Sequence, residues 1–151
     1  MNLIELGYIG LNAKDTDLWR PFAANFLGME TIDLGLRNIA LRMDEIAQRL
    51  IVQPSNMNGL GFLGLRVENE NEFEIALKEL HDIKVATKLA KADECELRSI
   101  EKMFSFQDPD GNTLEIYYGP KDADSPFAPS RKIGPFRTGD LGVGHVAINT
   151  T

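Results

Sequence analysis

The hydrophobic pattern at the start of the chain predicts a strand, a helix and three more strands. Residues 3–12 have the composition of a strand, and Ile9 and Leu11 would share the face that packs on the helix. Residues 15–27 are predicted to be helical, because capping residues are followed by an apolar stripe at helical spacing: Leu18, Phe22, Ala23 and Phe26. Short apolar runs then predict strands at 29–34, 38–43 and 48–53.

The same order of elements recurs in the next sixty residues. A strand is predicted at 61–67 and a helix at 71–80, with Phe73, Ala76, Leu77 and Leu80 on one side. Further strands are predicted at 83–87, weakly at 97–100, and at 103–106 and 113–118. The chain therefore contains a tandem βαβββ repeat, which favours an α+β fold with a curved, barrel-like mixed sheet and helices outside.

These patterns divide the chain into three parts. Residues 1–118 form a domain of two modules, at about 1–57 and 58–118, and 119–139 form a linker with four prolines. Residues 143–149 then match residues 6–12 position by position, with His145 where the first strand has Tyr8. We expect residues 140–151 to supply the first strand of a second, truncated domain, so that the chain is a fragment or a cloned domain.

Strand periodicity places three side chains on one face of the sheet. Tyr8, Phe62 and Glu115 have related positions in the two modules and point away from the predicted helices. A concave sheet face that is open on this side would form a pocket. Without further information, Tyr8 and Phe62 are as easily packing residues, Glu115 an internally bonded carboxylate, and His145 a half-buried strand histidine.

Composition excludes several classes of partner. The formal charge of −7 argues against nucleic acid, and the chain contains no apolar run of the length that a transmembrane helix needs. The single cysteine, Cys95, cannot form an internal disulfide, and its acidic neighbours disfavour the reactive thiolate. These features are typical of a cytoplasmic protein that does not bind a membrane.

Several motifs now support a family resemblance. Paired βαβββ modules that close on Asp-Pro-Asp-Gly-Asn-x-Leu-Glu at 108–115 resemble the vicinal oxygen chelate superfamily, which includes glyoxalases and bleomycin-resistance proteins. Three stretches resemble the type I extradiol ring-cleaving dioxygenases, specifically the amino-terminal domain of the 2,3-dihydroxybiphenyl 1,2-dioxygenase-like enzymes. They are Leu-Gly-Tyr-Ile-Gly at 6–10, Leu-Glu-Ile-Tyr-Tyr-Gly-Pro at 114–120, and Gly-Asp-Leu-Gly-Val-Gly-His at 139–145.

The resemblance implies a metal centre outside the first domain. Superfamily metal sites use a His on each of two opening strands and a Glu on a closing strand, a set that suits non-haem Fe(II). Here those positions hold Tyr8, Phe62 and Glu115, so the resemblance implies a vestigial site without metal and no catalytic residues in this chain. His145 would be the first Fe(II) ligand of the second domain, whose other ligands would lie beyond Thr151.

The resemblance also implies the partners and the reaction. The full-length enzyme would use Fe(II), a catechol-type aromatic and O2 in aromatic catabolism, and would open the ring beside the hydroxyls. We expect a homo-oligomer, since an orphan strand leaves an exposed edge. Two alternatives remain. One is a stand-alone module of the bleomycin-resistance type that binds a small aromatic near Tyr8, Phe62 and Glu115. The other is a glyoxalase-like isomerase, although the histidines that such an enzyme would need at positions 8 and 62 are Tyr8 and Phe62 in this chain.

Overall fold

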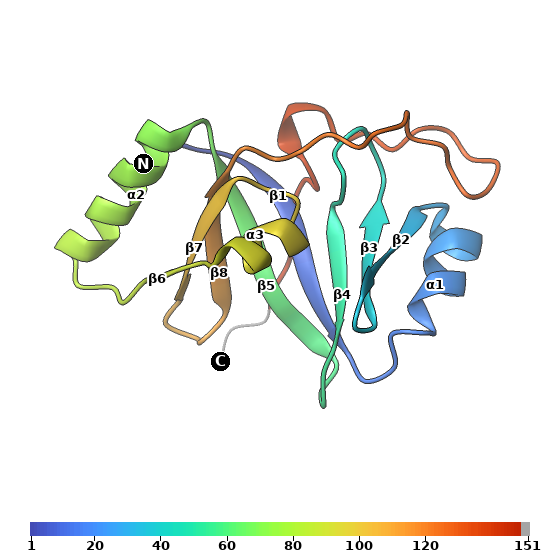
Figure 1. Ribbon diagram of the computed structural model, residues 1–151, viewed down its shortest axis with the longest axis horizontal. Helices are drawn as coiled ribbons and strands as arrows, with labels where there is room; N and C mark the ends of the chain where they lie inside the picture. The colour runs from blue at the N-terminus through green and yellow to red at the C-terminus, as the bar shows by residue number, and fades with distance from the viewer. Residues whose placement is uncertain (149–151) are drawn as a thin grey trace.

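A computed structural model describes residues 1–148, which build one open mixed sheet of eight strands (Figure 1). The first module contains β1 (Leu3–Ala13), α1 (Trp19–Pro21), the π-helix η1 (Phe22–Leu27), β2 (Glu30–Gly35), β3 (Asn38–Arg42) and β4 (Leu50–Pro54). The second contains β5 (Gly59–Val67), α2 (Glu70–Asp82), β6 (Lys88–Leu89), α3 (Ala92–Leu97), β7 (Lys102–Gln107) and β8 (Thr113–Tyr118).

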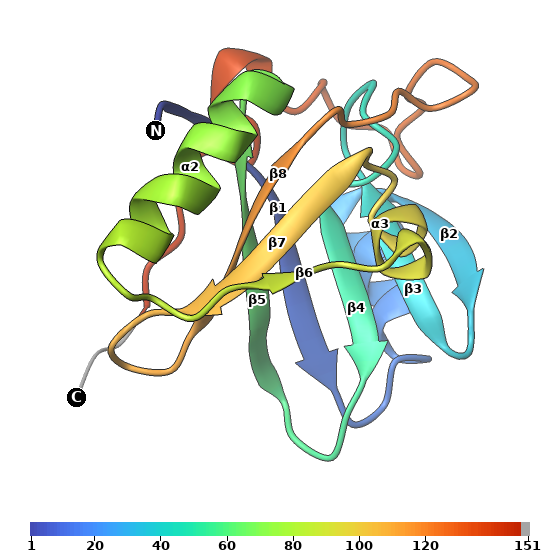
Figure 2. The same ribbon diagram turned by 60° about the vertical axis from the view of Figure 1, so that its left-hand side comes forward.

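Strand pairing repeats between the two modules. The order across the sheet is β2-β3-β4-β1-β5-β8-β7-β6, and the opening strand of each module pairs in parallel with its own closing strand, β1 with β4 and β5 with β8. The opening strands pair with each other in antiparallel fashion, so β1 and β5 form the centre of the sheet (Figure 2). The predicted fold class is confirmed, and side chains from both modules meet on the faces of these two strands.

The first helix turns a different side to the core from the one that the sequence pattern indicated. Leu18, Phe22 and Phe26 are 67%, 45% and 66% exposed, whereas Ala23 is fully buried. The core cluster under this helix contains Ala23, with Trp19 and Leu27 packed against it. Residues 19, 23 and 27 have the same spacing as 18, 22 and 26, so periodicity alone does not distinguish the two stripes. Of the predicted stripe, Ala23 is buried as expected, whereas the prediction is wrong for Leu18, Phe22 and Phe26.

The second module departs from prediction around its middle strands. Residues 83–87 were predicted as a strand, but the strand that pairs with β7 is the two-residue β6. The weak strand at 97–100 is also wrong, because Leu97 ends α3 and Ser99 has a φ of 52°. Helix α2 is present as predicted, and it begins one residue earlier, after Asn69, whose side chain accepts a hydrogen bond from the Glu72 amide at 3.1 Å. Helix α3 is therefore an element that the sequence did not predict.

The segment between residues 119 and 138 packs along the first module. Its backbone bonds to the module at several points, including the Ala123 amide to the Glu45 carbonyl at 2.9 Å and the Ser130 amide to the Gly28 carbonyl at 3.1 Å. Phe136 packs against the core cluster under the first helix. The guanidinium of Arg42, 2% exposed, pairs with Glu30 at 2.9 Å and donates to the Ser125 carbonyl. The predicted linker is thus a packed strap, and Figure 1 shows it crossing above β2 to β4.

The last described residues pack on the face of β1 and β5 that carries Leu6, Ile9 and Leu63, opposite the face that carries Tyr8 and Phe62. After the 3-10 turn η2 (Gly139–Leu141), Gly142 forms a parallel bridge with Leu6, and the Val143 amide donates to the Leu6 carbonyl at 2.8 Å. Val143 and Val146 pack on the cluster of Leu6, Ile9 and Leu63. Residues 143–148 form no regular strand, which differs from the predicted opening strand at 143–149, and Asn149 to Thr151 lie outside the described residues. The assignment of this segment to a second domain stays a prediction.

Candidate functional site

The face of the sheet that α3 covers, called the inner face, brings the three predicted positions together. Tyr8 on β1, Phe62 on β5 and Glu115 on β8 are all 2–3% exposed. The Tyr8 hydroxyl donates to Glu115 Oε2 at 2.7 Å, and the Tyr8 and Phe62 rings pack edge to face with centroids 6.0 Å apart. Strand alternation in β1, β5 and β8 therefore gave the correct faces, because neighbouring strands carry side chains of the same face into contact.

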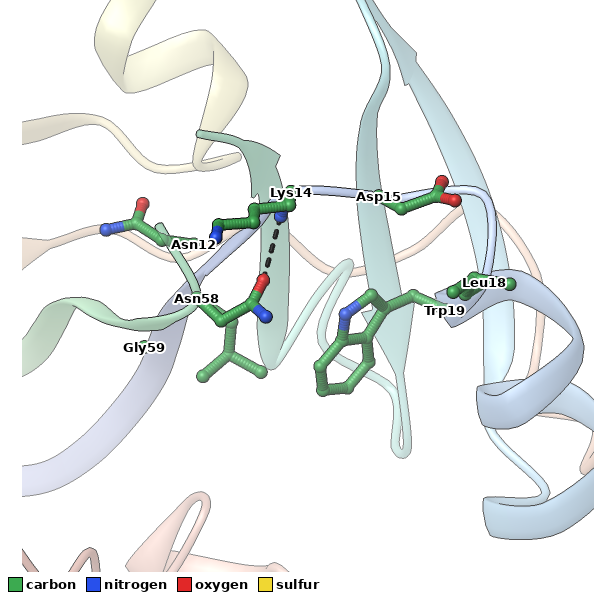
Figure 3. Close-up of a pocket in the computed structure, with 8 residues that line it drawn as sticks. Asn12, Lys14, Asp15, Leu18, Trp19, Asn58 and Gly59 are labelled. Carbon is green, nitrogen blue, oxygen red and sulfur yellow. Dashed lines mark hydrogen bonds between the residues drawn. The ribbon is translucent and has the colours of Figure 1, made fainter. Parts of the chain in front are cut away.

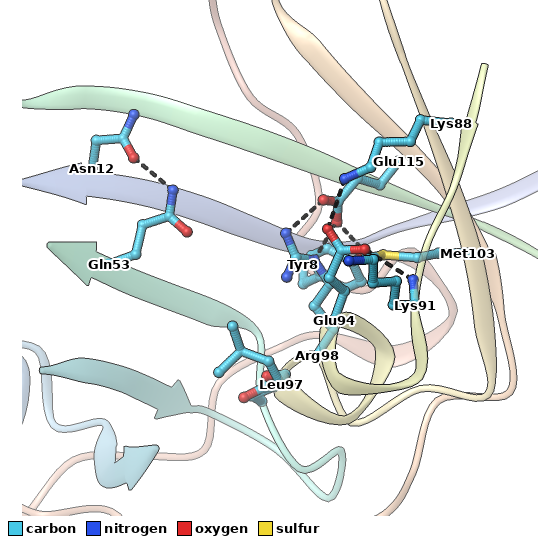
Figure 4. A network of polar contacts seen from close by, with 11 residues as sticks. Tyr8, Asn12, Gln53, Lys88, Lys91, Glu94, Leu97, Arg98, Met103 and Glu115 are labelled. Atoms are coloured by element: carbon cyan, nitrogen blue, oxygen red, sulfur yellow. Dashed lines mark hydrogen bonds and ion pairs between the residues drawn. The ribbon is translucent and has the colours of Figure 1, made fainter. Parts of the chain in front are cut away.

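A fourth residue, Arg98, completes the cluster and was not predicted from the sequence. It lies at the carboxyl end of α3, and its Nε and Nη2 donate to the two oxygens of Glu115 at 2.7 and 2.6 Å (Figure 4). Its guanidinium carbon lies 4.1 Å from the centre of the Phe62 ring. Such a fork-to-carboxylate pair over an aromatic face is typical of arginine. No spacing signal pointed to Arg98, because its segment was predicted as a strand.

Helix α3 closes the inner face that the sequence left open. Cys95 of α3 packs with Ile100, Met103 and Tyr117 in the same cluster as Tyr8 and Phe62. The two rings need glycines opposite them, since a Cβ at Gly64 would lie 2.3 Å from the Tyr8 ring and one at Gly10 would lie 2.3 Å from the Phe62 ring. The expected pocket at these residues is therefore wrong: their own side chains fill it, as the packing interpretation of Tyr8 and Phe62 had it.

The charges in this cluster are balanced by partners at hydrogen-bonding distance. Burial, reinforced by the adjacent Glu115 charge, raises the pKa of Tyr8 well above its ordinary value, so Tyr8 stays a neutral donor. Burial on its own would lower the pKa of Arg98, but the hydrogen bond and charge of Glu115 outweigh it and raise that pKa. Burial also raises the pKa of the Cys95 thiol, which agrees with its predicted lack of reactivity.

Comparison with known proteins gives a consistent result. The family model described as Dihydroxybiphenyl dioxygenase BphC D1 matches residues 6–55. The 1,2-dihydroxynaphthalene dioxygenase of Pseudomonas putida is 38% identical over 99% of this chain and 50% of its own length. The biphenyl-2,3-diol 1,2-dioxygenase of Sphingomonas paucimobilis is 38% identical over 95% of this chain and 49% of its own length. A crystal structure of catechol 2,3-dioxygenase superposes with a TM-score of 0.90 and 33% identity, covering 96% of this chain and 52% of that one.

The chain matches the amino-terminal half of extradiol ring-cleaving dioxygenases. This confirms the resemblance drawn from the motifs at 6–10, 114–120 and 139–145. The chain spans about half the length of the curated dioxygenases that it matches.

The donor set of the cluster does not fit the metal of an extradiol dioxygenase. A divalent cation would need free oxygen or nitrogen donors, yet Phe62 has none, and both Glu115 oxygens already accept hydrogen bonds from Arg98. A guanidinium also places a full positive charge beside Glu115, which repels a second cation. Within residues 1–148, no three His, Cys, Asp or Glu side chains are grouped in a way that could hold a metal ion.

His145 lies apart from this cluster. It is exposed, and its neighbours Val143 and Val146 pack on the outer cluster around Leu6, whereas Tyr8 and Glu115 belong to the inner face. The sequence match between His145 and Tyr8 therefore brings no ligand to the inner cluster.

Among residues 1–148, no helix is long and apolar enough to cross a membrane.

Proposed function

We propose that this chain is the non-catalytic amino-terminal domain of an Fe(II)-dependent extradiol dioxygenase that cleaves a catechol-type aromatic with O2. One observation carries the proposal. The chain is similar to a ring-cleaving dioxygenase along 99% of its length, yet Glu115, the one residue that keeps the ligand type of the superfamily metal site, is hydrogen-bonded to Arg98 and Tyr8. Residues 1–118 then act as a scaffold, in which the guanidinium of Arg98 pairs with Glu115 where a metal ion would otherwise lie.

His145 is the first iron ligand in this proposal, and residues 140–151 begin the catalytic domain. The strap at 119–138 and the bridge between Leu6 and Gly142 hold the chain just before His145 against the first domain, which supports this division. When bound, Fe(II) supplies two open coordination positions and a Lewis acid for the two reactants. The part played by residues 1–148 is to hold the entrance to the second domain and to exclude metal from the first.

The names of the relatives support a substrate with two adjacent ring hydroxyls, such as dihydroxybiphenyl or dihydroxynaphthalene. We also propose a cytoplasmic homo-oligomer, since one cysteine forms no internal disulfide and Phe22 and Phe26 expose apolar surface. The second candidate, a stand-alone binding module, loses its expected pocket because Arg98 and Phe62 fill it.

The experiment begins with the native gene downstream of codon 151. An open frame of about 130–150 further residues, a typical domain length, with a His and a Glu on its strands, is expected. The longer protein should bind iron and turn a dihydroxybiphenyl solution yellow, and His145→Ala should abolish both effects. His81→Ala is the matched control, because His81 is the other histidine of residues 1–151 and is exposed on α2. A stop codon at this point, or full iron content in His145→Ala, contradicts the proposal.

A further inference from the structure

A surface cavity of about 400 Å³ lies where β1 ends and β5 begins, and none of its lining residues belongs to the Arg98 cluster. Its walls come from two connections, the loop from β1 to α1 and the loop from β4 to β5 (Figure 3). The lining residues are Leu11, Asn12, Lys14, Asp15, Leu18, Trp19, Asn58 and Gly59. The volume lies within the range of small-molecule sites.

Internal hydrogen bonds hold the two loops in place. The Lys14 amide donates to Asn58 Oδ1 at 2.9 Å and ties one loop to the other. The Asn12 side chain accepts from Gln53 Nε2 at 2.7 Å and donates to the Leu60 carbonyl at 3.4 Å. Asn12 is thus already used by the protein. The side-chain oxygen of Asn58 accepts from the Lys14 amide, so the side-chain nitrogen of Asn58 remains available as a donor.

Three donor groups in the lining remain free. Within residues 1–148, no hydrogen-bonding partner is present for Lys14 Nζ, Asn58 Nδ2 or Trp19 Nε1. Figure 3 shows the indole of Trp19 and the Asn58 side chain on opposite sides of the gap, with the indole nitrogen on the side that faces Asn58. Asp15 is the one carboxylate in the lining; its Oδ1 accepts from the Asp17 amide at 3.1 Å and lies 3.6 Å from Arg37 Nη2, whose positive charge offsets the negative charge of Asp15.

We propose that this cavity binds a small carboxylate with a flat apolar body. The carboxylate would accept from Lys14 and Asn58, and a planar body would pack against Trp19 and Leu11, which supply the apolar wall. The whole chain carries a charge of −7, so an anion gains nothing from the general field and its binding must come from local groups. This inference does not depend on the ring-cleavage proposal.

The chain has a built-in probe for the test. Trp19 is its single tryptophan, so intrinsic fluorescence reports directly on the wall of the cavity. We would titrate the 151-residue protein with benzoate and, as a neutral ligand of the same shape, benzyl alcohol. Benzoate should change the fluorescence to saturation below about 10 mM, and benzyl alcohol should bind at least about tenfold more weakly.

Two variants locate the ligand. Lys14→Met keeps the alkyl stem and removes the charge, and it should weaken benzoate roughly tenfold. Lys132→Met makes the same change of net charge at an exposed position of the strap and should leave binding unchanged. Asn58→Asp keeps the acceptor for the Lys14 amide but replaces the donor with a negative charge, so it should abolish benzoate binding while the protein stays folded.

The result that overturns the proposal is equally specific. Benzoate that gives no saturable change, benzyl alcohol that binds as tightly as benzoate, or Lys132→Met that weakens binding as much as Lys14→Met each removes the assigned site. Selective loss in Lys14→Met and Asn58→Asp establishes it.

Discussion

Replacing Arg98 with methionine tests how much the buried ion pair stabilises the domain. The substitution keeps an unbranched side chain of similar length on α3 but removes the hydrogen bonds to Glu115 at 2.6 and 2.7 Å. The Glu115 side chain, 4% exposed, is then left with the Tyr8 hydroxyl as its remaining donor. Removing one partner of a buried pair typically costs about 3–5 kcal/mol, because the other charge stays buried and unpaired.

The low end of that range applies here. The Arg98 side chain is 10% exposed, so water can partly reach the position that the guanidinium leaves. We therefore expect the free energy of unfolding to fall by about 3 kcal/mol, a large part of the roughly 5–15 kcal/mol typical of a domain. The variant should still fold, which makes equilibrium urea denaturation followed by circular dichroism a suitable assay.

Two further proteins make the test specific. Arg98→Met with Glu115→Gln removes the orphaned charge, so the double variant should be more stable than Arg98→Met alone. Lys88→Met breaks the exposed pair between Lys88 and Glu94 beside the same helix and should change stability far less. Two results would contradict a large cost of the unpaired Glu115 charge: a free energy of unfolding of Arg98→Met within about 1 kcal/mol of the parent protein, or a double variant that is no more stable than the single one.

Other predictions follow from particular contacts. Phe26→Ser should change the free energy of unfolding by less than about 1 kcal/mol, since Phe26 is 66% exposed, and a larger loss in urea denaturation would contradict the exposed stripe. Because the pKa of Tyr8 is raised from 10.0, the folded protein keeps a proton that the unfolded chain loses. The contribution of Tyr8 to stability should therefore be constant below pH 10.0 and fall above it by about 1.4 kcal/mol per pH unit, and Tyr8→Phe should show a shallower alkaline slope. Gly142→Ala should release the terminal segment and speed hydrogen exchange of the Val143 amide, because Gly142 has a φ of 62° and a Cβ there would lie 2.4 Å from the Leu6 carbonyl oxygen; unchanged exchange would count against that docking. A chain that ends after residue 118 should unfold at lower urea than the 151-residue protein, since Arg42 loses its strap acceptor, and equal midpoints would mean that the strap is a free linker.

The sequence predicted most of the sheet because both modules follow a simple rule of alternation. Strands 113–118 and 38–43 were placed within a residue of β8 and β3, and the shared face of Tyr8, Phe62 and Glu115 was confirmed. Period-two patterns depend on which face is buried, and that information is written locally in each strand.

The parts that failed depend on contacts between distant residues. The orientation of the first helix is set by packing of Trp19, Ala23 and Leu27, which share their spacing with the exposed stripe. Helix α3 is six residues long, too short for a clear helical period, and what holds its end in place is the Arg98 pair with Glu115, seventeen positions along the chain. Local patterns could not reveal that an arginine fills the inner face.

In the proposed function, the guanidinium of Arg98 occupies the inner face of this domain, and residues 1–151 do not cleave the ring by themselves. The most direct test is to load the purified 151-residue chain with Fe(II) without oxygen, and then to add 2,3-dihydroxybiphenyl and air while recording the absorbance of the yellow ring-cleavage product. We predict no product and no iron retained after desalting. Sustained yellow product that disappears in Glu115→Gln would contradict the claim and make the inner cluster a working metal site.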